Sequence, residues 1–238
     1  YLSVQSGDSI FLHSNLGFSG ICKEINPAAT ILDSILTKIG PRGKLFLPAF
    51  SYAFPEGRTF NPTVLNFLSA MGAVSIYSYS VGFQLSRDPI FGVLGKGEGV
   101  DELFRAQTNR SFGPGSLFST LLDSNVKMLS INTGAGGTIL HEMEYRLSVP
   151  YRFDKKFQGK VLDSETKVIK DISWTSYVRD LENPTTEAKF DYLTELLYKE
   201  NIWQKFKLGK GYISCANSLD VYYYISKAIR LDPNILLK

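Results

Sequence analysis

Cysteine and histidine are scarce in this sequence, which has two of each among its 238 residues. Cys22 and Cys215 lie far apart and outside any CxxC spacing, so the sequence offers no paired-cysteine motif. We expect both thiols to be reduced, as in a cytoplasmic protein.

A strong charge of one sign and long apolar runs are also missing. The net charge is only +3 and no basic run stands out, so a nucleic-acid partner is not predicted. No apolar run approaches the roughly 20 residues of a membrane span, and the start shows no signal-peptide pattern. We therefore expect a cytoplasmic globular protein without nucleic-acid or membrane partners. The mild positive charge is compatible with an anionic cofactor or substrate.

What the sequence does contain is an alternation of apolar strands and amphipathic helices. Ser9 to His13 reads as a strand, Pro27 to Ile39 as a helix capped by Asn26, and Lys44 to Phe50 as a second buried strand. Strand, helix and strand in this order predict a βαβ unit with a right-handed crossover and a parallel sheet.

Further along the chain the pattern changes. From Lys155 to Val178 polar and apolar residues alternate over two expected strands, which predicts an antiparallel excursion. The fold prediction is a single domain over residues 1–238, a three-layer α/β/α arrangement with a mixed, largely parallel sheet and a small antiparallel lobe at about 151–180. Other expected elements are helices at 64–71, 100–106, 187–198 and 218–229, a helix running to Leu122, and strands at 90–94, 126–131 and 209–215.

The most informative stretch runs from Asn132 to Arg146. It follows the expected strand at 126–131, contains a turn with three glycines, and opens a helix at Thr138. On a helix, His141 shares a face with Glu144 and Tyr145, whereas Glu142 is turned about 100° aside. A histidine with a carboxylate one turn away is the minimum set for a general base.

Two alternatives compete with this interpretation. A lone His/Glu pair is more often an ordinary core or surface pair. The order His141-Glu142 also begins a zinc-protease motif, but Tyr145 stands where the second histidine is needed, so we expect no metal. The glycine turn favours catalysis, because free backbone N–H groups at a helix start can receive a phosphate or an oxyanion.

Two other loops follow strands and are candidates for ligand binding. The small-residue turn from Ser14 to Gly20 stands at a strand end, where α/β sheets bind ligands. The aromatic segment from Ser51 to Phe60 either shapes a substrate pocket or forms a self-packed lid.

Short motifs in a fixed order resemble the aminoglycoside 3-N-acetyltransferase family. They are Gly7-Asp8, His13-Ser14-Asn15-Leu16, Pro41-Arg42-Gly43, Leu47-Pro48-Ala49-Phe50 with Tyr52, Met71-Gly72, Ser86 with Asp88-Pro89, Phe112-Gly113, Ser116, and Thr138-Ile139-Leu140-His141 with Glu144-Tyr145. The matches extend from residue 7 to residue 152, with a fainter echo from Gly211 to Leu219.

The resemblance implies transfer of an acetyl group from acetyl-CoA to an aminosugar amine, on a fold distinct from the common acetyl-CoA-dependent superfamily. It implies that His141 is the general base and that Glu144 orients it. It also implies a role in antibiotic resistance, and a homodimer is possible. His13 is expected to shape its loop rather than act as a second base, and Thr138 to cap the helix. The implied CoA-binding residues are His13, Ser14, Asn15, Leu16, Gly17, Ser69, Ser86 and Phe112, and the implied substrate contacts are Tyr52, Asp88 and Glu142.

Departures from the family pattern leave the acceptor open. Asn15, Leu85 and Asp88 replace a usual serine, arginine and histidine, and a Thr-Pro pair before Met71 is missing. Aminoglycosides are polycations and call for a carboxylate-rich pocket. The first alternative is therefore an amino sugar carried on a nucleotide. The others are a CoA-binding protein without chemistry and an acyl-CoA hydrolase.

Overall fold

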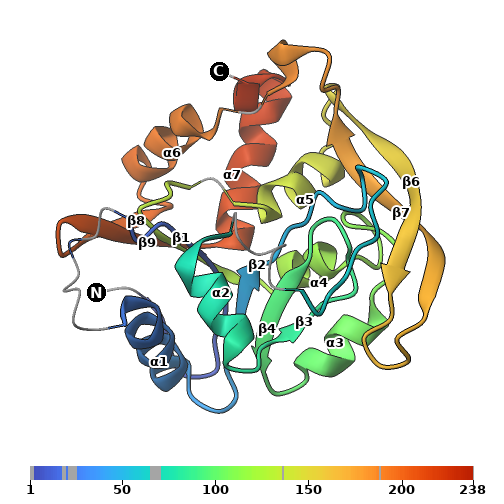
Figure 1. Cartoon of the computed structure of the whole chain (residues 1–238). Coiled ribbons are helices and arrows are strands. Elements are labelled where there is room, and N and C mark those ends of the chain that lie inside the picture. The colour runs from blue at the N-terminus through green and yellow to red at the C-terminus, as the bar shows by residue number, and fades with distance from the viewer. Residues whose placement is uncertain are drawn as a thin grey trace.

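A seven-stranded mixed sheet forms the centre of the molecule, with helices on both faces (Figure 1). The computed structural model describes residues 3–17, 20, 26–64, 71–135, 137–187 and 189–237. The strand order is β3-β4-β2-β1-β5-β9-β8. The bounds are β1 Ser9–Ser14, β2 Lys44–Pro48, β3 Gln84–Leu85, β4 Val93–Gly97, β5 Lys127–Ile131, β8 Gln204–Leu208 and β9 Gly211–Asn217.

Only the middle of this sheet is parallel. β1 pairs in parallel with β2 and with β5, and the other four neighbouring pairs are antiparallel. The prediction of a largely parallel sheet is therefore wrong, while that of a mixed sheet is confirmed. Two of the four antiparallel pairs have a local reason: β3 and β4 are joined by a short return of the chain, as are β8 and β9, and strands joined in this way run antiparallel.

The helices form the two outer layers, so the predicted three-layer arrangement is confirmed. Ile10 and Leu12 face the cluster under α1 and α2, whereas Phe11 between them faces the opposite cluster, as the alternation along a strand requires. The bounds are α1 Pro27–Ile39 and α2 Gly72–Ser80 on one face, and α3 Val100–Ala106, α4 Leu117–Asp123, α5 Ile139–Arg146, α6 Phe190–Lys199 and α7 Ser218–Leu231 on the other.

The predicted antiparallel lobe is also present. β6 (Arg152–Leu162) and β7 (Ile169–Arg179) pair along their whole length as a separate ribbon, which runs down one side of the molecule (Figure 1). Trp174 fastens the ribbon to the body: it is buried and donates its indole N–H to Ser111 Oγ at 3.1 Å. Phe60 adds a second attachment through its backbone bridge to Val161.

Some elements differ from the sequence prediction. The expected helix at 64–71 falls mostly on residues 65–70, which lie outside the described residues, and α2 begins after it at Gly72. The expected strand at 90–94 begins only at Val93, because Asp88 accepts hydrogen bonds from the amides of Ile90 and Phe91 and holds them in a turn. β8 was not predicted. No helix in the described part of the chain is long and apolar enough to cross a bilayer.

The predicted cap of α1 gives a direct test of local stability. Asn26 Oδ1 accepts hydrogen bonds from Ala28 N at 3.1 Å and from Ala29 N at 3.2 Å. Asn26→Ala should lower the free energy of unfolding by about 1 kcal/mol, because two amides lose their acceptor. Urea denaturation measures this, with exposed Ser34→Ala in the same helix as a control expected within a few tenths of a kcal/mol. Equal stability of Asn26→Ala and the parent would contradict the cap.

Candidate active site

The carboxyl ends of the three parallel strands meet at one edge of the sheet, and the candidate residues gather there. His13 and Ser14 end β1, the aromatic segment begins after β2, and Asn132 follows β5. This edge is where open α/β sheets bind ligands. The loop after β5 leads into α5, the helix that carries His141 and Glu144.

His141 and Glu144 are in direct contact, as their spacing predicts. His141 Nδ1 lies 2.6 Å from Glu144 Oε2. The Glu144 side chain is completely buried, and the His141 side chain is 18% exposed. Because an ionised carboxylate can only accept a hydrogen bond, Nδ1 carries the hydrogen and Nε2 holds the free lone pair of the ring.

Glu144 has two further partners from the segment that follows α5. Tyr151 donates its hydroxyl hydrogen to Glu144 Oε1 at 3.0 Å. Arg152, the first residue of β6, places Nε 2.8 Å from Glu144 Oε2 with only 7% of its side chain exposed. This second contact is an ion pair by proximity, without the linear N–H···O alignment of a strong hydrogen bond.

Three phenylalanine rings surround His141. Phe112 lies with its centroid 5.7 Å from that of His141 and perpendicular to it, and Phe91 and Phe190 lie at 6.2 Å and 6.1 Å. Phe112 and Phe91 also pack edge to face against each other, with centroids 4.9 Å apart. The rings fix the plane of the imidazole and remove water from most of its surface.

This environment keeps His141 neutral and Glu144 ionised. Burial lowers the pKa of His141, the nearby charge of Arg152 lowers it further, and Glu144 only partly opposes them. Burial alone would raise the pKa of Glu144, but its contacts with His141, Arg152 and Tyr151 outweigh burial, and its pKa lies below the usual value. A neutral imidazole beside a carboxylate is the form in which a histidine can accept a proton at pH 7.

His13 lies close to this group and is bound to the same helix start. Its Nε2 is 3.3 Å from Thr138 Oγ1, and its ring packs 4.9 Å from that of Phe11. Burial, followed by repulsion from His141, lowers the pKa of His13 to about 4. Thr138 makes no side-chain capping bond at α5, so the expected cap is wrong and its hydroxyl contacts His13 instead.

The first loop forms a compact turn beside these residues. Asn15 Oδ1 accepts a hydrogen bond from Gly17 N at 3.1 Å, and Asn15 O accepts one from Asn132 Nδ2 at 3.0 Å. Ser14 is half-buried, and its carbonyl oxygen lies against Gly72 at the start of α2. Leu16 packs on the apolar cluster below the loop. The loop is therefore at the expected edge of the sheet, and its binding of CoA stays a prediction.

The other expected CoA-binding residues are placed less favourably. Ser86 is buried, and its Oγ accepts a hydrogen bond from Val93 N at 2.9 Å, so it closes the β3–β4 connection. Phe112 is fully buried and supports the His141 ring from inside the protein. Burial does not favour a contact of either side chain with CoA, and that role stays a prediction. Ser69 lies outside the described residues.

Of the three expected substrate contacts, only Tyr52 is accessible, with 63% of its surface exposed on the loop after β2. Asp88 is buried and holds the amides of Ile90 and Phe91, and burial raises its pKa to about 6. Glu142 is also buried: Oε2 accepts from Gly113 N at 2.6 Å and Oε1 from Arg146 Nε at 2.9 Å. Both carboxylates are occupied within the protein, so this structure does not favour Asp88 and Glu142 as substrate contacts, and that role stays a prediction.

The glycine turn before α5 offers fewer free amides than its sequence suggested. Gly134 N donates to Tyr212 OH and Ala135 N to Thr194 Oγ1, each at 3.0 Å. These bonds fix the turn to β9 and α6, so neither amide is available to an oxyanion. Ser14 remains as a candidate donor from the first loop, since no other described residue accepts its hydroxyl hydrogen.

The comparisons with known proteins agree with this architecture. The family model described as aminoglycoside 3-N-acetyltransferase matches residues 11–230. The chain belongs to this family. No curated protein sequence matches the chain significantly.

Solved structures of the same family share the fold at low sequence identity. Aminoglycoside acetyltransferase AAC(3)-Xa matches with a TM-score of 0.76 and 15% identity, over 96% of this chain and 88% of the other. AAC-IIIb in its binary complex with CoASH matches with a TM-score of 0.76 and 15% identity, over 97% of this chain and 92% of the other. A histidine-to-alanine mutant of AAC(3)-IVa in complex with apramycin matches with a TM-score of 0.76 and 15% identity, over 98% of this chain and 89% of the other.

Family membership makes the chain an acetyl-CoA-dependent N-acetyltransferase, as the sequence predicted, with acetyl-CoA as its co-substrate. The sequence did not single out Tyr151 and Arg152. Their positions follow from a reversal of the chain after α5, where Ser148 adopts a positive φ of 50° and Val149 N bonds to Glu144 O. No periodicity signals such a contact. Among the described residues, no cluster of three or more His, Cys, Asp or Glu is arranged for a metal ion.

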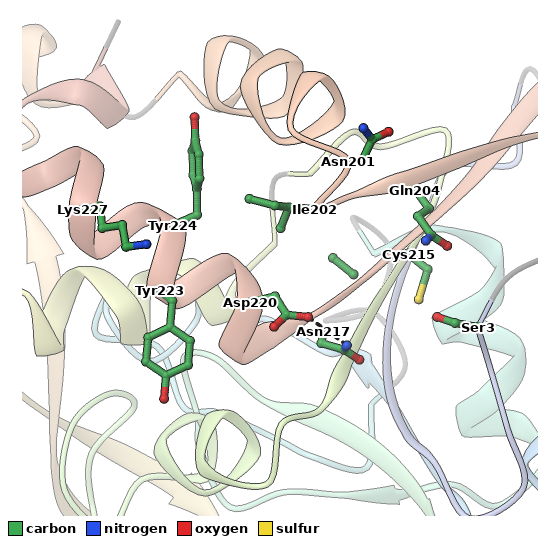
Figure 2. A pocket seen from close by; sticks show the side chains of 11 residues that line it. Ser3, Asn201, Ile202, Gln204, Cys215, Asn217, Asp220, Tyr223, Tyr224 and Lys227 are labelled. Atoms are coloured by element: carbon green, nitrogen blue, oxygen red, sulfur yellow. Dashed lines mark hydrogen bonds between the residues drawn. The ribbon is translucent and has the colours of Figure 1, made fainter.

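One cavity of the acetyltransferase is lined by residues of β9, α7 and the start of β8, and His141 is not among them. Figure 2 shows residues that line it: Asp220, Tyr223, Tyr224 and Lys227 from α7, and Ile202 and Gln204 from the chain at the start of β8. Asn217, which lines the cavity, pairs with Lys127 at the amino end of β5. The cavity therefore lies at the opposite edge of the sheet from His13, which is near the carboxyl end of β1. Cys215 lines it as a free thiol, and burial raises the thiol pKa to about 11. Cys22 lies outside the described residues.

The placement of Glu142 predicts a loss of stability rather than of substrate affinity. Glu142→Gln should lower the free energy of unfolding by about 2 kcal/mol, because a buried ion pair with Arg146 is broken. Urea denaturation together with steady-state kinetics tests this. The KM for the amine should stay close to that of the parent. A raised KM with unchanged stability would return Glu142 to the substrate site.

Proposed function

We propose that this chain transfers the acetyl group of acetyl-CoA to the amine of an aminosugar, with His141 as general base. The observation that carries the proposal is the 2.6 Å contact between His141 Nδ1 and buried Glu144, at the carboxyl edge of the parallel strands. The contact leaves Nε2 as the basic atom of a neutral ring. Family membership supplies the reaction class.

The reaction follows from these groups. The lone pair of the uncharged acceptor amine attacks the thioester carbonyl carbon, and Nε2 of His141 takes one proton from the attacking nitrogen as the C–N bond forms. The carbonyl π electrons move to oxygen, and the resulting oxyanion needs a hydrogen-bond donor, for which Ser14 is our candidate. The C–S bond then breaks, the electron pair leaves with the CoA sulfur, and the imidazolium returns its proton to the thiolate. Glu144 stabilises the transient imidazolium.

For CoA we propose the first loop, residues 13–17, together with the start of α2. Gly72 lies against the carbonyl of Ser14, so the amino end of α2 stands beside the end of β1. A helix start carries free N–H groups and a partial positive charge, which suit the phosphates of CoA. His13 and Asn15 shape this loop through their bonds to Thr138 and Gly17.

For the acceptor we propose an aminoglycoside amine, since solved relatives are complexed with apramycin, a gentamicin and sisomicin. The alternative acceptor, an amino sugar carried on a nucleotide, has an observation in its favour. Asp88 and Glu142 are occupied within the protein, and two of the rings beside His141, Phe91 and Phe190, are only partly buried. Aromatic rings stack on a base or pack on a sugar face, whereas a polycation is held by carboxylates.

Loss of the base should stop turnover without weakening CoA binding. His141→Ala should lower kcat by about 100-fold or more, because the amine then keeps its proton. Glu144→Gln should lower kcat by less, since the ring keeps its nitrogen but loses its ionised partner. Thiol release measures kcat, and calorimetric titration measures CoA affinity. Glu142→Gln on the same helix is the control and should keep parental kcat. Parental turnover by His141→Ala would rule out the base.

The acceptor is decided by thiol release from acetyl-CoA with a panel of amines. We expect release with aminoglycosides and none in the control without amine. Thiol release only with nucleotide-linked amino sugars would show that these are the acceptors, and the proposed acetyl transfer would stand. Release without any amine would indicate a hydrolase, and CoA binding with no release anywhere would indicate a binding protein.

A further inference from the structure

Glu144 is a buried carboxylate whose two oxygen atoms are both occupied. Oε2 is shared by His141 Nδ1 at 2.6 Å and Arg152 Nε at 2.8 Å, and Oε1 accepts the Tyr151 hydroxyl hydrogen at 3.0 Å. The three partners come from α5, from the turn after it and from β6. Because they approach from different elements, the carboxylate cannot rotate without breaking one contact.

A histidine beside an unbalanced buried carboxylate would be a poor base at rest. The carboxylate favours the imidazolium, so the ring would already hold the proton that it must accept from the amine. Arg152 changes this balance, since its guanidinium stays charged and lies against the same oxygen atom. The charges that face His141 in the described residues are those of Glu144 and Arg152, with the neutral groups Tyr151 and His13 beside them.

We propose that Arg152 is a positioning residue whose charge balances Glu144, so that Glu144 orients the His141 ring without drawing a proton onto it. The inference rests on the proposed role of His141 as base. Tyr151 completes the arrangement by holding the oxygen that His141 and Arg152 do not use. In the reaction, the same arrangement lets the transient imidazolium form without leaving a second uncompensated charge.

The chain offers a matched control on the same helix. Glu142 pairs with Arg146 at 2.9 Å and is buried like Glu144. Arg146 also bonds to Asp123 and to Ser119, and none of these groups contacts His141. Removing the Arg146 charge therefore breaks a comparable ion pair of α5 without changing the charge beside the imidazole.

The test is an NMR pH titration of the histidine Hε1 signals, which needs no substrate. The sequence has only two histidines, and a His13→Gln variant assigns them. In Arg152→Gln the titration midpoint of His141 should rise by about one pH unit or more, because the carboxylate is no longer balanced. Arg152→Lys, which keeps the charge, should stay near the parent midpoint, and so should Arg146→Gln.

A folded Arg152→Gln with an unmoved His141 midpoint would overturn the proposal. If Arg152→Gln does not fold, the double variant Glu144→Gln with Arg152→Gln decides, because it removes both charges together. Its midpoint should lie within about half a unit of the parent, and a larger rise would contradict the balance of the two charges.

Steady-state kinetics provide a second test and distinguish the role of Arg152 from the proposed role of His141 as base. Arg152→Gln should lose about tenfold in kcat at pH 7 and recover part of it at higher pH, where the imidazole is neutral again. Arg146→Gln should show no such recovery. If His141→Ala turned over normally, the proposed function would fail, while the titration shift would still report the charge balance.

Discussion

The site depends on one buried carboxylate. Glu144 has no access to water, so its charge is tolerated only through the groups that contact it: His141 from its own helix, and Tyr151 and Arg152 from the chain that follows. Those contacts in turn set the properties of the histidine. They fix which ring nitrogen carries the hydrogen, hold the ring in one orientation, and keep it neutral in spite of a negative neighbour.

The fold serves this arrangement in two ways. The parallel strands β1, β2 and β5 end at one edge of the sheet and bring His13, Ser14 and the loop after β5 beside the start of α5. The reversal after α5 then returns the chain, so that β6 begins directly against the helix that carries His141 and Glu144. The β6–β7 ribbon, which runs down one side of the molecule (Figure 1), is thus more than an appended hairpin. Its first residue, Arg152, supplies the charge that faces Glu144.

Local sequence patterns predicted much of this structure. Three features depend on residues that are close together in the sequence, where helix and strand periodicity determine which side chains share a face. They are the cap and apolar spacing of α1, the alternation along β6 and β7, and the contact of His141 with Glu144 one turn away. The strand directions outside the centre, the short strand β8 and the partners Tyr151 and Arg152 did not follow from such patterns. They depend on how distant or reversing segments pack. Asp88 and Glu142 show the same limit, because the sequence does not tell whether a carboxylate faces a ligand or is hydrogen-bonded within the protein.

The most direct test of this account is the protonation state of His141 in the unmodified protein at pH 7. Long-range proton–nitrogen correlation spectra of the nitrogen-15-labelled chain distinguish protonated from bare ring nitrogens, and only two histidines contribute signals. The account predicts a neutral ring with hydrogen on Nδ1, facing Glu144, and a bare Nε2. A ring protonated on Nε2, or on both nitrogens, would contradict it, because His141 could then not take a proton from the amine.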